Sequence, residues 1–360
     1  MLRTFMTSQH SYIDRTGKAV IDVSGYESAG NFSEGLAAVK VRNKGWGFIN
    51  TTGALVIPPN FESAFTFNEG LAPVLLDGKR GFINKNGTLV IENQYDWVEG
   101  FSEGVAVVQR PSSPKRSEMP RPTGSDILGH SNIVEVWDLT NDSGDRQADN
   151  DSEFLAIDTT GQILANLDQK KIEVDIDDAR FSEGLLCVHS LEKDAMGYVN
   201  KSWEFVIQPT FAAAAPFSEG LARVAVIESE MEKLGFIDKK GEFVIPPEFN
   251  TDFDFRRNSS NFSEGLAAIS EGLNPTRTKA ETFVYVDKKR EIVLATDFFY
   301  AGAFHDGLAT VYSADTDRWG FIDRTGKVAV PVQYESANDF SEGLALVSRS
   351  DRNRNAFIIH

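Results

Sequence analysis

The chain has 360 residues, of which 41% are apolar and 25% are charged, a composition typical of folded soluble proteins rather than disordered ones. This length accommodates two or three ordinary domains or one long repeat array. The net charge of -17 argues against nucleic acid as a partner and disfavours an anionic membrane surface. We interpret the acid excess as a contribution to solubility.

The chain shows no targeting or membrane signal. Its first eight residues lack the sustained apolar stretch of a signal peptide. No stretch of 18 apolar residues without charge is present, so we expect no membrane insertion. Cys187 is the single cysteine, so no intramolecular disulfide can form, and we expect it to fill a core position. These features together predict a cytoplasmic protein.

One short motif, Phe-Ser-Glu-Gly-Leu-Ala with close variants, returns eight times along the sequence. Its glycines are Gly35, Gly70, Gly104, Gly184, Gly220, Gly265, Gly307 and Gly343. Their spacing is close to 35 residues, and the longer gaps indicate insertions. A fixed period of this length is typical of a repeat array, so we predict a single array over residues 1–360.

Each unit contains three segments with the character of short strands, at 36–41, 46–50 and 54–58 in the first complete unit. The turn between the second and third strands begins with Asn or Asp and has glycine at its fourth position, as in Asn50-Thr51-Thr52-Gly53. We predict a type I turn capped by the Asx side chain and closed by a left-handed glycine. One carboxylate per turn is too few for a calcium site, so we expect no metal there.

The third strand usually ends near an aromatic residue: Phe61, Tyr95, Phe211, Phe249 or Tyr334. The connector that follows could be a fourth, outer strand or a crossing loop. Both faces of the strands are apolar, so small sheets must stack on one another. We predict an all-β fold of three- to four-stranded antiparallel sheets packed face to face, β-propeller-like with about eight units, with an open β-solenoid or superhelix as the alternative.

The two ends of the chain bear on ring closure. The strand at 344–347 could complete the unit that begins at 12–21 and close a ring of eight. Possible additional strands at 2–6 and 356–359 argue against such a simple closure.

An insertion at 110–152 accounts for the longest gap, and we expect it to be partly disordered. Its first part is rich in proline and basic residues, residues 133–137 resemble an extra strand, and residues 141–152 are acidic. The acidic part lacks the glycine offset of a calcium-binding loop.

The segments Trp46-Gly47-Phe48-Ile49-Asn50 and Trp319-Gly320-Phe321-Ile322-Asp323, lying between copies of the first motif, resemble the bacterial WG-repeat (KWG repeat) family. The signature tryptophan is replaced by Arg80, Met196 or Leu234 in other units. The resemblance implies an interaction repeat and transfers no catalytic residue to this chain.

The sequence contains no recognisable catalytic constellation. The five histidines lack metal-ligand spacing, and no nucleophile elbow, phosphate loop or dinucleotide fingerprint is present. We therefore predict a non-enzymatic protein with no catalytic residues, no cofactor and no metal.

The motif acids could form an acidic rim that binds a basic partner or cations. They are Glu34, Glu69, Glu103, Glu183, Glu219, Glu264, Asp306 and Glu342. The alternative, which we favour, is that each acid binds backbone donors of its own turn.

For function, we predict a protein–protein interaction scaffold with an unknown protein partner. The alternative is a small-molecule or glycan binder, with Trp97 or Trp203 exposed for stacking in a central channel or a groove. An enzyme is the third and weakest possibility.

Overall fold

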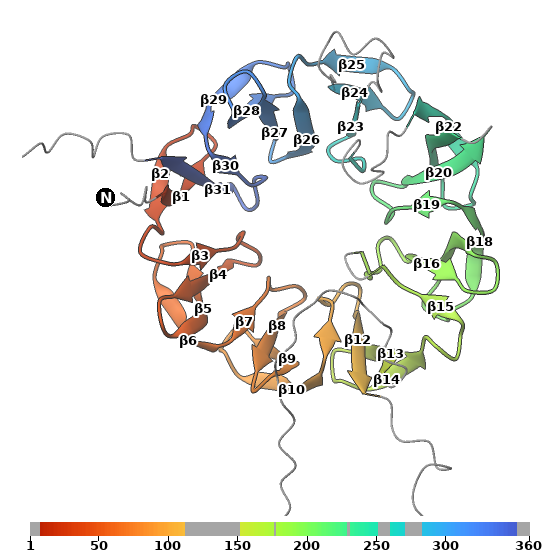
Figure 1. Cartoon of the computed structure of the whole chain (residues 1–360), viewed down its shortest axis with the longest axis horizontal. Coiled ribbons are helices and arrows are strands. Elements are labelled where there is room, and N and C mark those ends of the chain that lie inside the picture. The colour runs from red at the N-terminus through yellow and green to blue at the C-terminus, as the bar shows by residue number, and fades with distance from the viewer. Residues whose placement is uncertain are drawn as a thin grey trace, which may run out of the picture.

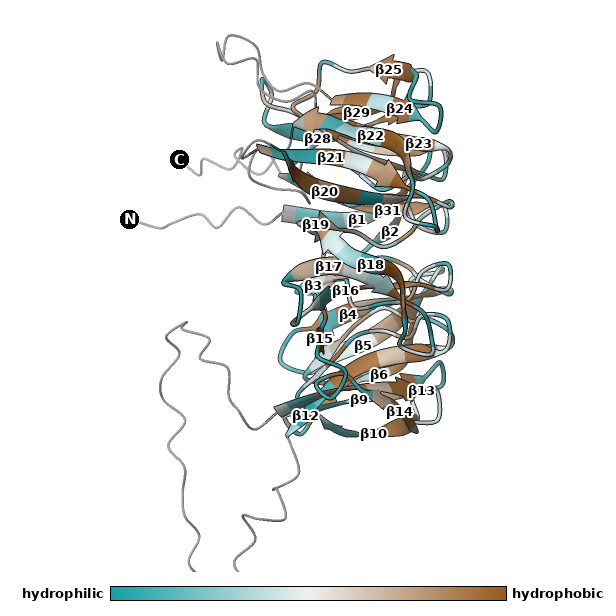
Figure 2. Ribbon diagram, turned by 90° about the vertical axis from the view of Figure 1, so that its right-hand side faces the viewer, coloured by the Kyte–Doolittle hydropathy of each residue, from teal (hydrophilic) through white to brown (hydrophobic). Residues whose placement is uncertain are grey.

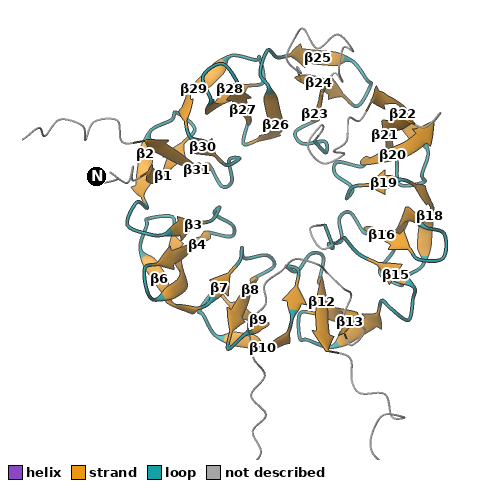
Figure 3. Ribbon diagram, viewed as in Figure 1, coloured by secondary structure: helices purple, strands orange, loops and turns teal. Residues whose placement is uncertain are grey.

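The computed structural model describes residues 8–111, 152–175, 178–228, 231–250, 260–270 and 283–350. These residues contain no helix and form eight small antiparallel sheets arranged in a ring (Figure 1). The protein is therefore an eight-bladed β-propeller, as predicted, and the open superhelix is excluded. Figure 3 shows that the strands make up the body of the ring and that loops point toward its centre.

We number the blades in the order in which the chain enters them. Blade 1 consists of β30 (Ser336–Ala337), β31 (Leu344–Ser350), β1 (Ser8–Asp14) and β2 (Ala19–Asp22). Blade 2 consists of β3 (Ser28–Ala29), β4 (Leu36–Val41), β5 (Gly45–Asn50) and β6 (Leu55–Phe61). Blade 3 consists of β7 (Ser63–Ala64), β8 (Leu71–Leu76), β9 (Lys79–Asn84) and β10 (Leu89–Tyr95). Blade 4 consists of β11 (Trp97–Val98), β12 (Val105–Pro111), β13 (Ser152–Asp158) and β14 (Ile163–Asn166).

The second half of the ring repeats the same order. Blade 5 consists of β15 (Ile172–Glu173), β16 (Leu186–Ser190), β17 (Ala195–Val199) and β18 (Phe205–Phe211). Blade 6 consists of β19 (Ala213–Ala214), β20 (Ala222–Glu228), β21 (Met231–Ile237) and β22 (Phe243–Asn250). Blade 7 consists of β23 (Leu266–Ser270), β24 (Phe283–Asp287) and β25 (Ile292–Ala295). Blade 8 consists of β26 (Tyr300–His305), β27 (Leu308–Ser313), β28 (Arg318–Asp323) and β29 (Val328–Tyr334).

The ring is closed within blade 1, whose strands come from both ends of the chain. Strand β31 pairs with β1 over seven residues, from Ser8 opposite Ser350 to Asp14 opposite Leu344. The predicted completion of the first unit by the last motif is confirmed. The possible additional strands at 2–6 and 356–359 lie outside the described residues.

The connector before each motif supplies the first strand of the next sheet. It usually forms only a two-residue strand, such as β3 or β7, which pairs with the strand that starts at the motif. The outermost strand is instead the predicted third strand, such as β6 or β10, at the periphery of the ring (Figure 1). The connector, for which the sequence left an outer strand and a crossing loop as alternatives, is neither of these. It forms the strand at the opposite end of the sheet from the outer strand.

The hydrophobic core is divided into eight clusters, one between each pair of neighbouring blades. Each motif phenylalanine is at most 3% exposed and packs on the preceding blade. Phe67, for example, lies 4.9 Å from Phe48 of blade 2, measured between ring centroids. Such a pair contributes about 0.5–1.5 kcal/mol beyond the burial of its area. Stacking of two-sided apolar sheets, inferred from the sequence, is thus the main source of cohesion.

The hairpin turns that begin at Asn or Asp, here called Asx turns, have the predicted geometry. In blade 2 the Oδ1 atom of Asn50 accepts hydrogen bonds from the backbone N–H groups of Thr52 and Ala54. Gly53 follows with φ 81°. The same turn recurs in the other seven blades, with Trp203 and Arg290 in the left-handed position in two of them.

The glycine of the Trp-Gly pair is required by a close approach of two backbones. A Cβ atom added to Gly47 would lie 2.4 Å from the carbonyl oxygen of Ile57 on the outer strand. Five blades have this glycine, and their outer strands are seven or eight residues long. Blades 1, 4 and 7 have Ser11, Leu155 and Val284 in this register, and their outer strands have four residues.

The boundaries of the insertion differ slightly from those predicted. Residues Arg110 and Pro111 extend β12 and pair with Glu153 and Ser152 of β13. The pairing of β12 with β13 therefore includes residues at both ends of the predicted insertion, 110–152. The predicted extra strand at 133–137 and the acidic stretch at 141–151 lie outside the described residues.

Candidate functional site

The motif folds into a two-residue hairpin turn at the start of each long inner strand. In blade 2 the backbone groups of Ser33 and Leu36 exchange hydrogen bonds of 2.9 and 3.1 Å. Both central residues are left-handed, Glu34 with φ 54° and Gly35 with φ 81°. Two successive positive φ angles define a type I′ turn, which matches the twist of the paired strands. The left-handed position of the glutamate was not anticipated from the sequence.

The acid of each motif turn binds the motif turn of the next blade. The carboxylate of Glu34, for example, accepts a 3.0 Å hydrogen bond from the backbone N–H of Gly70. The same contact recurs around the whole ring with distances of 2.8–3.0 Å. The remaining pairs are Glu69–Gly104, Glu103–Gly184, Glu183–Gly220, Glu219–Gly265, Glu264–Gly307, Asp306–Gly343 and Glu342–Gly35. Eight acids therefore form a closed circle of inter-blade hydrogen bonds, which we call the acid ring.

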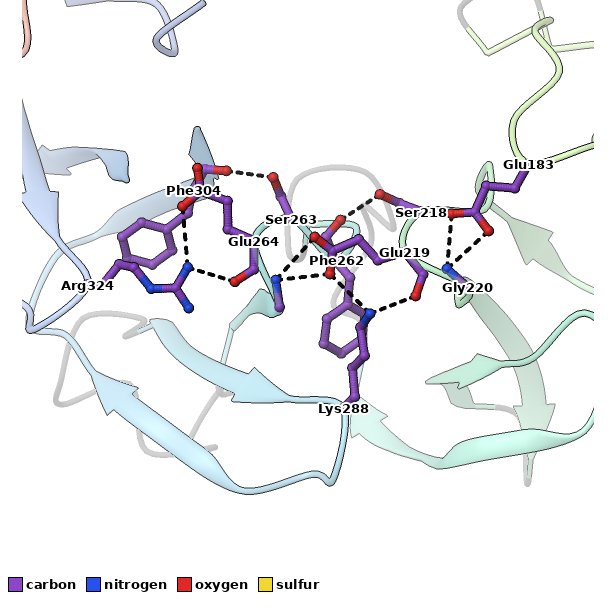
Figure 4. A network of polar contacts seen from close by, with 11 residues as sticks. Glu183, Ser218, Glu219, Gly220, Phe262, Ser263, Glu264, Lys288, Phe304 and Arg324 are labelled. Carbon is purple, nitrogen blue, oxygen red and sulfur yellow. Dashed lines mark hydrogen bonds and ion pairs between the residues drawn. The ribbon is translucent and has the colours of Figure 1, made fainter. Parts of the chain in front are cut away.

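The motif serine adds a second contact between neighbouring turns (Figure 4). The hydroxyl of Ser218 donates a 2.6 Å hydrogen bond to the carbonyl oxygen of Phe262, the motif phenylalanine of the next blade. Six blades make this contact, with distances of 2.5–2.8 Å. Asn68 and His305 replace the serine in blades 3 and 8. In six blades the motif serine and the motif acid therefore both form hydrogen bonds with the motif turn of the next blade.

Basic residues of the Asx turns neutralise most of the acid ring. Lys288 lies 3.2 Å from the carboxylate of Glu219 and also donates to the Glu219 carbonyl oxygen (Figure 4). Six acids have such an ion pair, at 3.0–3.3 Å: Glu34–Lys85, Glu103–Lys201, Glu183–Lys239, Glu219–Lys288, Glu264–Arg324 and Asp306–Arg15. Thr51 and Thr159 occupy the basic position beside Glu342 and Glu69. Within the described residues these two acids have no basic partner.

The contacts shift the titration of two ring members. Partial burial tends to raise the pKa of Glu34, but the hydrogen bond and charge of Lys85 and the Gly70 N–H outweigh it and lower the pKa below its usual value. Burial also acts to raise the pKa of Glu183, and there the Gly220 N–H and Lys239 together outweigh it, so that this pKa is lowered as well. Both side chains therefore carry a negative charge at neutral pH.

The structure brings all eight predicted rim acids together on one face, but in a different role from the one we favoured. Each acid binds a donor of the neighbouring turn, not of its own. The error arose because identical units suggested a local role, whereas in a closed ring identical neighbours allow an equally regular contact between units. Sequence spacing alone cannot distinguish these two cases.

The two tryptophans considered for ligand stacking are not openly exposed. Trp203 is 8% exposed and belongs to the core between blades 4 and 5. Trp97 is half-buried and packs edge-on against Phe154, with centroids 6.2 Å apart. The expectation of exposed stacking is wrong for Trp203. In the part of the chain that the structure describes, no group of three or more His, Cys, Asp or Glu residues is arranged to hold a metal ion.

A comparison with known families decides the assignment. The model of the WG containing repeat matches residues 11–44, 46–79, 81–110, 196–226, 235–272 and 319–351, which is more than half of the chain. The chain belongs to the WG-repeat family. The six matched segments of this WG-repeat protein follow the blade period, each starting near a central strand and running into the next blade.

Three solved structures are similar to this chain at low sequence identity, with TM-scores below 0.5. The extracellular domain of a hybrid two component system, BT3049, from B. thetaiotaomicron is 12% identical with a TM-score of 0.38 over 79% of this chain. KlHsv2 with its loop 6CD replaced by a Gly-Ser linker is 9% identical, with a TM-score of 0.41 over 92% of this chain and 97% of its own. A prolyl endopeptidase is 9% identical, with a TM-score of 0.46 over 91% of this chain.

The WG-repeat chain spans 37% of the BT3049 domain and 49% of the prolyl endopeptidase. The sequence matches no protein of curated function. Among the described residues no helix has the length and apolar character needed to cross a membrane.

Proposed function

We propose that this WG-repeat propeller is a non-enzymatic scaffold for protein–protein interaction in the cytoplasm. The observation that carries the proposal is an apolar belt around the outside of the ring. Every outer strand contributes one side chain that is 45–54% exposed. The members of this outer belt are Val20, Val56, Val90, Leu164, Val206, Val244, Val293 and Val328.

The outer belt is too regular to be incidental exposure. In seven blades it occupies the second position of the outer strand, followed by a core residue such as Ile57 or Ile91. A strand with one solvated face normally alternates apolar with polar residues, so a polar residue is expected at the belt positions. Brown segments on β6, β14 and β25 mark this surface in Figure 2. A regular series of exposed apolar side chains of this kind favours contact with another protein.

The outer strands also present backbone groups to a partner. Each is the last strand of its sheet, so one of its edges has no neighbouring strand in the described part of the chain. Edges of this kind pair readily with an extended segment of another chain. The eight acids of the motif turns, by contrast, all have hydrogen-bond partners within the ring, which supports giving them a structural rather than a catalytic role.

The test is partner capture with the intact chain and a belt variant. We expect Val56→Lys with Val90→Lys to lose the proteins that the intact chain retains from a native lysate, because two charges then enter the apolar surface. The matched control is Asn60→Lys with Gln94→Lys, which adds the same charge at exposed polar positions of the same two strands. The control is expected to retain the partner.

Deletion of residues 112–151 provides the competing arm. Because Pro111 and Ser152 already face each other across the ladder, an Asn-Gly turn can join them without disturbing β12 and β13. A partner that is lost with this deletion but retained by the belt variant would overturn the belt as the interaction surface. The absence of any partner for the intact chain would count against the scaffold itself.

A further inference from the structure

Blade 3 departs from the repeat at two positions close to one another in space. Arg80 stands where blades 2 and 8 carry the signature tryptophans Trp46 and Trp319. Asn68 stands where six other motifs have serine. Both residues line a pocket of about 250 Å³ formed by blade 3, the β11 segment of blade 4 and the start of the blade 5 motif. Because Arg80 and Asn68 differ from the residues at the same positions of most other blades, the repeat fold alone does not account for this pocket.

Arg80 has an incomplete set of hydrogen-bond acceptors in this pocket. Its Nη1 atom donates to the backbone oxygen of Asp96, and its guanidinium carbon lies 6.0 Å from the centroid of the Phe65 ring. Its Nε atom is buried and has no hydrogen-bond partner among the residues that the structure describes. A polar donor without an acceptor destabilises the folded state, so an acceptor from outside the chain that reaches the remaining N–H groups of the Arg80 guanidinium would be bound favourably.

A second arginine faces the same space. Arg180 lines the pocket and is exposed, and no acidic side chain within the described residues forms an ion pair with it. Glu99 also lines the pocket and takes part in an interaction of its own. Two arginines against one acid give the pocket a positive charge in a chain whose net charge is -17.

The remaining walls favour a flat apolar group. Phe65 is 45% exposed, and Trp97 and Pro73 lie beside it. Arginine binds carboxylates through paired N–H groups, and aromatic rings pack against planar or apolar groups. The volume is slightly below the range of about 300–1,000 Å³ typical of small-molecule sites, so the ligand must be small.

We propose that this pocket, the arginine pocket, binds the carboxylate of a small ligand that also carries an aromatic or apolar group. The carboxylate accepts hydrogen bonds from the guanidinium groups of Arg80 and Arg180. The apolar group packs against Phe65 and Trp97. This site is separate from the outer belt and does not depend on the scaffold proposal. Such a carboxylate can come from a free metabolite or from the C-terminal residue of a polypeptide.

The experiment is a calorimetric titration of the full chain with benzoate and with benzamide, its neutral analogue. We expect benzoate to bind and benzamide to bind at least about tenfold more weakly, because only the carboxylate satisfies both arginines. Equal binding of the two, or no binding of benzoate, would overturn the proposal.

The first variant places at position 80 a residue that another blade of this chain has at the same position. Arg80→Met introduces the residue that blade 5 carries at the same position, Met196, so the fold is expected to persist. We expect it to weaken benzoate binding about tenfold, and Arg80→Lys, which keeps the charge but lacks the paired N–H groups of a guanidinium, to weaken it as well. Arg42→Met, at an exposed site in blade 2, is the matched control and is expected to bind normally. Unchanged binding in Arg80→Met would overturn the assignment.

Two further probes distinguish the sources of the carboxylate. A pentapeptide ending in phenylalanine is compared with the same peptide carrying a C-terminal amide, and both are compared with N-acetyl-phenylalanine. Tighter binding of the free-acid peptide than of N-acetyl-phenylalanine supports a polypeptide terminus as the ligand. Binding of N-acetyl-phenylalanine alone supports a free metabolite. Binding of the amidated peptide as tightly as the acid would contradict the role of the carboxylate.

Discussion

Trp203 occupies a turn position that is glycine in six of the eight blades, and it does so with φ 62°. In these six blades an outer-strand residue of the preceding blade fills the space. A Cβ on Gly87, for example, would lie 2.9 Å from Ile57 Cγ2. Blade 4 has Ala165 in place of that isoleucine, and opposite it Ala156 in place of the usual aromatic residue. The indole therefore fills the volume that two alanines leave open.

This compensation predicts a specific pattern of stability changes. Trp203→Gly is expected to lower the free energy of unfolding by about 3 kcal/mol, because the lost packing exceeds the relief of the left-handed backbone. Adding Ala156→Phe and Ala165→Ile restores the residues of the other blades and should recover most of the loss. Urea unfolding of the single and triple variants measures both effects. A triple variant no more stable than Trp203→Gly would show that the three positions do not share one space.

At the scale of the strand, the glycine of the Trp-Gly pair controls how far the outer strand can pair. The five blades with this glycine pair their outer strands up to a residue opposite the tryptophan position, as Tyr95 does with Arg80. A side chain in its place would collide with the outer-strand backbone. The signature glycine is therefore a determinant of strand length as well as of family membership.

Substitution of one such glycine should shorten one strand. In Gly81→Val the new Cβ lies within 3 Å of the Ile91 oxygen and the Asn93 backbone. We expect faster hydrogen exchange at the amides of Asn93 to Tyr95, with protection kept at Leu89. Gly25→Val is the control, since no atom lies within 4 Å of an added Cβ there and its φ is not positive. Unchanged exchange in Gly81→Val would contradict this role.

Much of the strand-level structure could be predicted from the sequence, because its causes are local. The Asx turns depend on side chains that bond to their own backbone, and the two-sided apolar strands imply stacked sheets. The rim of acids was predicted, but its inter-blade hydrogen bonds could not be, because Glu34 and Gly70 meet only after two blades pack. The pocket at Arg80 was also missed. Its signal was present in the sequence as a tryptophan replaced by an arginine, but a single unit cannot show where that side chain points.

At the scale of the whole molecule, the acid ring couples stability to pH. The pKa values of Glu34 and Glu183 are lowered in the folded state, so their contribution is complete above the unfolded value of 4.5 and is lost as the pH falls through the folded values. The pKa values of Asp14, Asp158, Asp238 and Asp323, lowered by bonds within the Asx turns, act in the same direction.

We therefore expect the urea midpoint to change little above about pH 5 and to fall steeply below it. Glu34→Gln combined with Glu183→Gln should lower the midpoint at neutral pH and flatten this acid dependence, because the two titrating groups are gone. Glu92→Gln, at an exposed position outside the ring, is the comparison and should leave the profile unchanged. An acid dependence identical in all three proteins would argue against the ring as its source.

The pairing of β1 with β31 also sets the order in which the molecule can be completed during synthesis. Strand β1 leaves the ribosome before the other seven blades, and its partner at 344–350 emerges only after them. Until then β1 has an unpaired edge, and the inter-blade cluster that joins Ile13 to residues of blade 8 cannot form. A newly made copy therefore has one more unpaired strand edge than the finished ring, and that edge always lies at the seam of blade 1.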